Sequence, residues 1–284
     1  MTDIIRKRIF IVGCSRFGTT MLQSCFARHP EIFTFPETAL LIKALGRRAW
    51  SRPLSWAGIS SGKEWLAVKN ILDAHGRTQR PNSKFHSLRN SLRRICNELD
   101  GITLEQNKSI WLEKTPRHFY RANAISNYIP DSHVIHIIRD GSSVVASIFD
   151  RAKKYPEHFA RQARPGYAVR QWNSAIKRHA DLLGTPNHSF LLFEEFTASP
   201  ESQLRRLCTE AKIEFDSQML EGSTDDAQHI NKEEHWKAGS TGTIEPPIDK
   251  FSSLFTEKER KQILKKLDWV RHSEIKAYLK ESIV

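Results

Sequence analysis

The sequence predicts an α/β fold in which a parallel sheet is flanked by helices, with residues 1–284 forming a single domain. Short apolar runs rich in β-branched residues alternate with longer segments of helical periodicity, which is the pattern of parallel strands joined by helices. The hydrophobic content of 39% and the charged content of 27% are those of an ordinary globular protein. One α/β domain can reach roughly 250 residues, so a chain of 284 residues fits a single domain that carries an insertion.

The first predicted element is a strand over residues 9–12, and a glycine loop and a helix follow it directly. Gly13 and Gly18 punctuate the loop, and apolar residues then recur at helical spacing (Met21, Leu22, Cys25 and Phe26). This arrangement turns backbone N–H groups and a helix N-terminus toward a phosphate. The spacing from Gly13 to Gly18 is that of a Walker A loop, but Thr19 stands in the position of the Walker lysine. The loop is therefore suited to a phosphate yet lacks the main group that holds ATP or GTP.

Further strands and helices alternate along the rest of the chain. Strands are predicted over 31–35, 109–112, 133–138 and 189–193, and helices over 118–128, 142–151, 166–183 and 200–212. The segment from about 39 to 108 is mostly helical, with breaks at 52–53 and over 76–83. It is therefore predicted to be a helical insertion between two strands.

The C-terminal part begins with a segment, residues 221–250, that is rich in Gly, Ser, Thr, Asp and Pro. Such a composition predicts a long loop, which is a candidate lid. Together with the insertion and residues 150–170, it is expected to form the wall of an acceptor site. A last helix is expected to begin at Thr256, where a capping box precedes an apolar stripe over 263–270.

Polar residues follow the predicted strands. The glycine loop follows the first strand, Glu37 the second, Lys114 the third and Arg139 the fourth. In a parallel sheet these ends meet at one edge, where ligands bind. A guanidinium at this edge can clamp a phosphate, and Ser147 on the next helix could share the anion with Arg139. The alternative is that Arg139 forms a structural ion pair with a neighbouring acid.

The charge balance is strongly basic, with 44 Lys and Arg against 32 Asp and Glu, for a net charge of +12. That surplus indicates an anionic ligand, an acidic acceptor or a nucleic acid. The four cysteines have no metal-ligand spacing, so no metal site is expected and a reducing compartment is plausible (Cys14, Cys25, Cys96 and Cys208). No signal peptide and no apolar run of about 20 residues is found, which predicts a cytoplasmic chain without a membrane span.

Four motifs over residues 8–201 resemble those of the sulfotransferase family, in the family's order. Residues 14–20, Cys-Ser-Arg-Phe-Gly-Thr-Thr, resemble the family's 5′-phosphosulfate loop. Residues 137–147 resemble its 3′-phosphate motif, with Arg and Ser eight positions apart. Residues 111–116, Trp-Leu-Glu-Lys-Thr-Pro, are similar to a segment of the branch that includes protein-tyrosine and many bacterial and carbohydrate sulfotransferases. Residues 193–201 resemble the family's Tyr-Glu-x-Leu…Pro-Glu segment.

This resemblance implies a P-loop NTPase-like sulfotransferase fold and an enzyme that uses 3′-phosphoadenosine 5′-phosphosulfate (PAPS) without a metal. The acceptor would be a hydroxyl or an amine. Arg139 and Ser147 would hold the 3′-phosphate, and Phe193, where many relatives have Tyr, would lie next to the adenine. The implied 5′-phosphosulfate site consists of Ser15, Arg16, Phe17, Gly18, Thr19 and Thr20.

The resemblance also implies the reacting centre. Glu37 matches the position of the catalytic Glu of the tyrosylprotein branch and would accept the proton of the acceptor. Lys114 and Arg16 would stabilise charge on the leaving oxygen. In the alternative interpretation, Glu37 is an N-cap or first-turn acid that stabilises the start of the next helix through the helix dipole. A histidine is the rival base, and the candidates are His29, His118 and His136. His118 could line the cleft, whereas His136 is expected to be a core residue.

Two other functions compete with sulfuryl transfer. A P-loop kinase for a small molecule is disfavoured because Thr19 replaces the Walker lysine. A nucleic-acid-binding protein is disfavoured because the basic residues are spread along the chain, so nucleic acid is not an expected partner. The sequence leaves the acceptor open among carbohydrate, lipid, small molecule and protein tyrosine, and it leaves the oligomeric state open.

Overall fold

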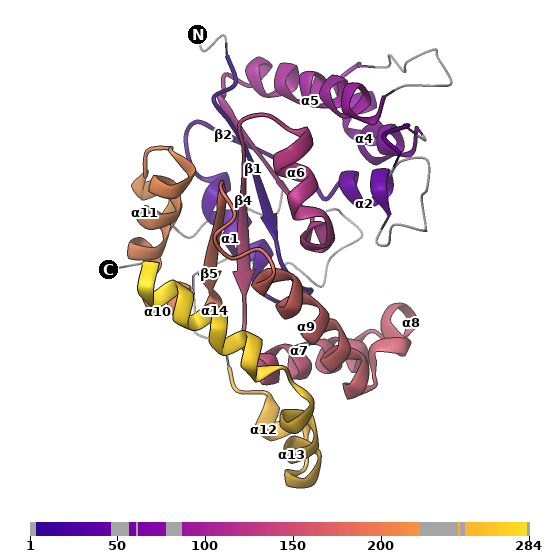
Figure 1. Cartoon of the computed structure of the whole chain (residues 1–284), viewed down its shortest axis with the longest axis vertical. Helices are drawn as coiled ribbons and strands as arrows, with labels where there is room; N and C mark the ends of the chain where they lie inside the picture. Colours follow the sequence, from indigo (N-terminus) through magenta and orange to yellow (C-terminus); the bar gives the residue numbers. More distant parts are fainter. Residues whose placement is uncertain are drawn as a thin grey trace.

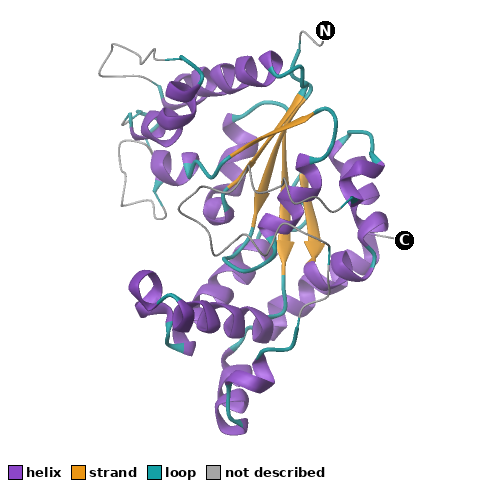
Figure 2. Cartoon of the chain, turned by 180° about the vertical axis from the view of Figure 1, so that it is seen from behind, coloured by secondary structure: helices purple, strands orange, loops and turns teal. Residues whose placement is uncertain are grey.

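A five-stranded parallel sheet forms the centre of the molecule, with helices on both sides (Figures 1 and 2). The computed structural model describes residues 4–46, 57–60, 62–77, 87–221, 244 and 248–282. The strand order is β2-β3-β1-β4-β5. The strands are β1 (Lys7–Val12), β2 (Ile32–Phe35), β3 (Ile110–Lys114), β4 (Ser132–Ile138) and β5 (His188–Leu192). Every residue of β3 and β4 is buried, as a parallel sheet that is covered on both faces requires.

Helices connect the strands and cover the two faces of the sheet. The helix α1 packs against β2 and β3, α6 against β4, and α11 and α14 against β5. The α-helices are α1 (Thr19–Ala27), α2 (Leu40–Leu45), α4 (Lys63–Ala74), α5 (Leu88–Glu105), α6 (Ala122–Tyr128), α7 (Gly141–Lys154), α8 (Pro156–Phe159), α9 (Pro165–Ala180), α10 (Phe193–Ala198), α11 (Pro200–Ala211), α12 (Phe251–Leu254), α13 (Glu257–Lys266) and α14 (Trp269–Ser282). The 3₁₀ helices are η2 (Pro116–Arg121), η3 (Ala160–Gln162) and η4 (Ser217–Leu220).

The described residues between β2 and β3 are mostly helical, as predicted for residues 39–108, and they form α2, α4 and α5. The helix α5 buries one face at helical spacing, through Leu88, Leu92, Ile95, Leu99 and Ile102. The predicted breaks at 52–53 and over 78–83 lie outside the described residues, as does most of the candidate lid at 221–250.

Some predicted boundaries were wrong. Lys114 is the last residue of β3 rather than a residue after it, and Phe193 begins α10 rather than ending β5. The predicted helix over 118–128 starts earlier, as the 3₁₀ helix η2 with Pro116 at its first position, and continues as α6. The capping box at Thr256 is confirmed. The apolar stripe that follows was wrong in part, since Leu264 and Val270 are exposed and α13 ends before Leu267.

No helix in the described ranges is both long enough and apolar enough to cross a membrane.

Candidate active site

The carboxyl edge of the sheet carries a cavity of about 460 Å³. Its lining comes from the loop after β1, the segment after β2, the turn after β3 and the residue after β4. This is the edge at which ligands bind in parallel sheets. Of the predicted site residues, eight line the cavity: Ser15, Arg16, Gly18, Thr19, Thr20, Glu37, Arg139 and Phe193.

The glycine loop lies close against neighbouring groups. Gly18 has a φ of 96°, and a Cβ atom there would lie 2.3 Å from the Phe193 ring. Gly18 is also the N-cap residue of α1, so no N-cap side chain covers the first amides of that helix. Phe17 points into the core, and its N–H donates to the carbonyl of Cys14. The first amides of α1, whose residues line the cavity, are therefore suited to an anion.

Arg16 and Arg139 meet beside this loop. The Nε of Arg16 donates to the Oγ of Ser147 at 2.9 Å, and an Nη of Arg139 donates to the carbonyl of Arg16 at 3.2 Å. The Arg139 guanidinium lies over the Phe193 ring, 4.4 Å from its centroid. Arg16 thus contacts both residues that the sequence predicted to share one anion, Arg139 through its carbonyl and Ser147 through its side chain. Ser147 is not among the residues that line the cavity.

Both arginines are half-buried, and loss of solvent lowers the pKa of each guanidinium. Repulsion from Arg16 lowers the pKa of Arg139 further, although Glu194 opposes the shift. The Nε of Arg139 is buried without a hydrogen-bond partner among the described residues. No direct ion pair joins Asp140 and Arg139 in the described part of the chain, although the charge of Asp140 also opposes the lowering of the Arg139 pKa. The Asp140 carboxylate caps α7 by accepting from the N–H of Ser143 at 3.1 Å. An anionic ligand would compensate this uncovered positive charge.

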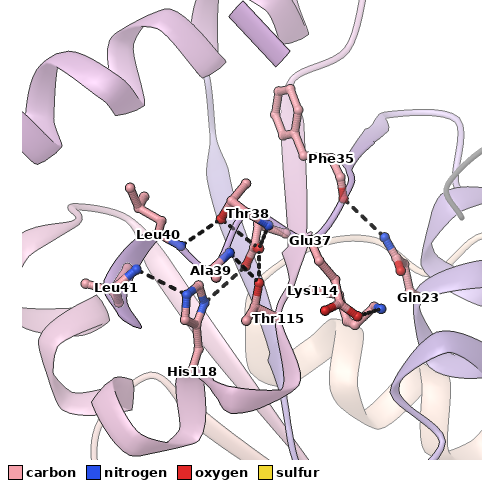
Figure 3. A network of polar contacts seen from close by, with 11 residues as sticks. Gln23, Phe35, Glu37, Thr38, Ala39, Leu40, Leu41, Lys114, Thr115 and His118 are labelled. Carbon is pink, nitrogen blue, oxygen red and sulfur yellow. Dashed lines mark hydrogen bonds and ion pairs between the residues drawn. The ribbon is translucent and has the colours of Figure 1, made fainter. Parts of the chain in front are cut away.

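Glu37 and Lys114 form an ion pair at the end of β2 and β3. The Nζ of Lys114 lies 2.6 Å from the Oε1 of Glu37 (Figure 3). The side chain of Lys114 is 4% exposed and that of Glu37 is 27% exposed. Parallel pairing of the two strands, with Phe35 opposite Glu113, brings the two residues to the same place. Glu37 lines the cavity, whereas Lys114 is not among the lining residues and reaches it only through this contact with Glu37.

The three candidate histidines lie in the protein interior. His118 is fully buried, and its Nε2 accepts the N–H of Leu41 at 3.1 Å. His29 contacts the carbonyl of Glu214 at 3.0 Å. The expectation that His136 is a core residue is confirmed.

Arg151 is a cavity residue that the sequence reasoning missed. Its guanidinium contacts the Oγ of Ser15 at 3.3 Å and the Oε1 of Gln162 at 2.7 Å, and it lies 4.2 Å from the Phe159 ring centroid. Burial, with repulsion from Arg16, lowers the pKa of Arg151 to about 10. The signal was present in the sequence, because Arg151 follows Ser147 by four positions and so lies on the same helix face.

The far wall of the cavity is aromatic and polar. It is formed by Phe119 and Tyr120 from η2, Phe159 from α8, Gln162 from η3 and Gln171 from α9. Phe159 and Gln162 come from the predicted wall segment 150–170.

Comparison with known proteins gives one consistent result. A family model described as "Sulfotransferase family" matches residues 8–217. Protein-tyrosine sulfotransferase A of Caenorhabditis elegans is 25% identical over 227 residues, which are 75% of this chain and 51% of that protein. A putative protein-tyrosine sulfotransferase of Caenorhabditis briggsae is 23% identical over 229 residues, which are 78% of this chain and 70% of that protein. The chain thus spans about half the length of the first of these relatives.

Two solved structures share the fold. The sulfotransferase domain of the Synechococcus PCC 7002 olefin synthase has a TM-score of 0.59 at 16% identity, covering 93% of this chain and 95% of that one. The sulfotransferase domain from the curacin biosynthetic pathway has a TM-score of 0.52 at 15% identity, and the match covers 93% of this chain and 98% of that one.

Proposed function

The chain belongs to the sulfotransferase family, and from this premise we propose that it transfers the sulfuryl group of PAPS to a hydroxyl or an amine of an acceptor. The observation that carries the proposal is the cavity itself. It joins a phosphate-binding loop, uncovered arginines and a carboxylate that is paired with a lysine.

The loop and the arginines form the donor site of this proposal. Amides and hydroxyls of Gly18, Thr19 and Thr20 bind the 5′-phosphosulfate. A Walker lysine is not needed, because PAPS has no γ-phosphate. Arg139 and Ser147 bind the 3′-phosphate, and the buried Nε of Arg139 provides a donor that lacks a partner among the described residues. Arg151 adds a further guanidinium to the same cavity.

Phe193 has a supporting role in this donor site. Its ring lies against Gly18 and beneath the Arg139 guanidinium, and the residue is only 4% exposed. It therefore holds the loop and the arginine in place, and its ring edge borders the cavity next to the adenine.

Glu37 and Lys114 perform the chemistry in this proposal. The acceptor oxygen or nitrogen forms a bond to sulfur while the bond from sulfur to the bridging phosphate oxygen breaks. The proton of the acceptor passes to the carboxylate of Glu37, and the electron pair of the broken bond stays on the phosphate of the leaving nucleotide. Lys114 stabilises that oxygen, with Arg16 as a second cation beside the loop. Glu37 is favoured over His118 because Glu37 lines the cavity, whereas His118 is fully buried.

Two measurements test this proposal. In the first, adenosine 3′,5′-bisphosphate (PAP) and ATP with Mg²⁺ are compared as stabilisers in thermal unfolding. PAP at about 100 times its Kd is expected to add roughly 2.7 kcal/mol to the free energy of unfolding, and hence several degrees to Tm. Stabilisation by ATP with Mg²⁺ but not by PAP would instead support a kinase.

In the second measurement, ³⁵S-labelled PAPS is incubated with the protein and a panel of acceptors. The panel contains a tyrosine peptide, an oligosaccharide, a lipid with a hydroxylated headgroup, a phenol and an amino alcohol. Label is expected to pass to at least one of these classes. A protein that binds PAP but transfers label to none of them would contradict the proposed activity on these acceptor classes.

A further inference from the structure

Four consecutive backbone N–H groups next to Glu37 donate to side chains (Figure 3). Thr38 donates to the Oε1 of Glu113 at 2.9 Å, and Ala39 donates to the Oγ1 of Thr115 at 3.0 Å. Leu40 donates to the Oγ1 of Thr38 at 3.0 Å, and Leu41 donates to the Nε2 of His118 at 3.1 Å. Three of the four acceptors come from one short stretch of chain, residues 113–118.

These bonds replace the cap that α2 lacks. The N-cap residue of α2 is Ala39, which has no polar side chain and a φ of 56°. A non-glycine residue in this left-handed region costs about 1 kcal/mol or more. The first amides of a helix also need acceptors from outside the helix. Thr38 supplies the acceptor for Leu40, and His118 supplies that for Leu41. Glu113 and Thr115 bind the two amides just before the helix, so residues 113–118 hold the backbone in this conformation.

Glu113 lies at the centre of the network. Its Oε1 accepts from the N–H and hydroxyl of Thr38 and from the hydroxyl of Thr115, and its residue is 2% exposed. Its Oε2 lies 3.2 Å from the Nδ1 of His118. Because the Nε2 of His118 accepts a hydrogen bond, the ring proton is on Nδ1 and faces this carboxylate.

The same stretch also carries Lys114. Successive side chains of a strand point to opposite faces, so Glu113 faces the network while Lys114 faces Glu37. One stretch of six residues thus holds the segment on which Glu37 lies and supplies the partner of Glu37. We propose that Glu113, Thr115 and His118 are positioning residues that fix the Glu37 carboxylate opposite Lys114, an inference that rests on the proposed role of Glu37. His118 then acts through the backbone of Leu41 and takes no proton from the acceptor.

A pair of substitutions at Thr38 tests this inference. Thr38→Val keeps the shape of the side chain but removes both bonds of its hydroxyl, whereas Thr38→Ser keeps the hydroxyl. Thr38 is not among the residues that line the cavity. Thr103→Val is the matched control, because it removes a buried hydroxyl that donates to the Leu99 carbonyl within α5.

Each variant is compared with wild type for kcat and KM with ³⁵S-labelled PAPS, using the acceptor of the panel that wild type sulfates fastest. Thr38→Val is expected to lower kcat about tenfold or more, because a displacement of about 1 Å can cost 10²-fold. The KM for PAPS and the Kd of PAP should stay within about twofold, since the donor site is untouched. Thr38→Ser should recover most of kcat, and Thr103→Val should leave kcat unchanged.

A second pair of variants covers the case in which Thr38→Val fails to fold. His118→Gln keeps an acceptor for the Leu41 N–H, and His118→Leu removes it. If kcat is at least about fivefold higher in His118→Gln than in His118→Leu, the result supports positioning through the backbone. Equal loss in both variants overturns it.

Crystal structures separate this inference from the proposed function. The Glu37–Lys114 contact should be lost in Thr38→Val and kept in Thr38→Ser. A wild-type chain that transfers no label contradicts the proposed function, and the crystal structures then still decide whether the network holds Glu37. An active wild type whose kcat is unchanged in Thr38→Val overturns the inference alone.

Discussion

The ammonium group of Lys114 lies 2.6 Å from the carboxylate of Glu37, although the two residues are 77 positions apart in the chain. Adjacent parallel strands bring them together. A lysine that is 4% exposed needs a partner, because an unpaired buried charge is costly. In the proposed reaction, the leaving phosphate competes with Glu37 for Lys114, which frees the carboxylate to accept a proton.

Glu37→Gln is expected to lower kcat by 10²–10⁴-fold, the usual contribution of a positioned base. Glutamine keeps the shape of the side chain but cannot accept the proton. The Kd of PAP should stay within about threefold, because the donor site remains intact. The assay is ³⁵S transfer, with PAP binding measured by calorimetry. Glu31→Gln is the control, since Glu31 pairs with Arg6 at the opposite end of β2. Full turnover in Glu37→Gln would require a different base.

Arg139→Ala is expected to raise the Kd of PAP by roughly 10- to 100-fold. A hydrogen bond to a charged group contributes about 1.5–3 kcal/mol, which corresponds to that range. Arg139→Lys should recover only part of the affinity, because lysine lacks the planar fork. Arg205→Ala, which removes an exposed arginine paired with Glu201, serves as the control for lost positive charge. Unchanged affinity in Arg139→Ala would refute its assignment to the donor site.

Gly18→Ala is expected to lower both the stability and the affinity for PAP. The φ of 96° disfavours any side chain, and the new Cβ would lie 2.3 Å from the Phe193 ring. The cost should exceed about 2 kcal/mol, because strain and overlap add. The double variant Gly18→Ala/Phe193→Ala removes the overlap but not the strain. In urea unfolding, the double variant should therefore lose less stability than the sum of the losses in the two single variants. Losses that simply add would contradict this contact.

The stability of the protein is expected to fall as the pH drops from about 6.5 toward 4, because three histidines share a buried cluster. His136 contacts His179 at 2.8 Å and His188 at 2.9 Å. Burial lowers the pKa of His179 to about 3 and that of His188 to about 4, and it lowers the pKa of His136 as well. The unfolded chain therefore binds more protons in this range, so acid favours unfolding.

Each of these histidines contributes at most about 1.4 kcal/mol per pH unit to this loss. Urea unfolding between pH 7.5 and 5 measures the slope. The variant His179→Phe, whose new ring would lie near Phe17 and Phe119, should show a smaller slope than wild type. A free energy of unfolding that stays constant over this range would contradict the prediction.

The strands and the phosphate loop could be predicted because their signals are local. The apolar run before Gly13 and the spacing to Gly18 lie within a few residues of each other. The carboxyl-edge rule then placed the loop, Glu37 and Arg139 around one cavity. For the far wall of the cavity, the sequence predicted a segment but not the individual lining residues, because these come from four separate helices. The burial of His118 was not predicted, because its neighbours include residues as distant in the chain as Leu41, whose N–H donates to its ring 77 positions away.

The sequence by itself determined the order of strands and helices, the glycine loop and the family, because periodicity and motif spacing are properties of short stretches of chain. Only the tertiary structure decided that Lys114 pairs with Glu37, that residues 113–118 bind backbone amides at the start of α2 and that Arg151 joins the cavity. These features depend on which strands are neighbours and on which polar groups lose water, and burial and register arise only when the whole chain packs.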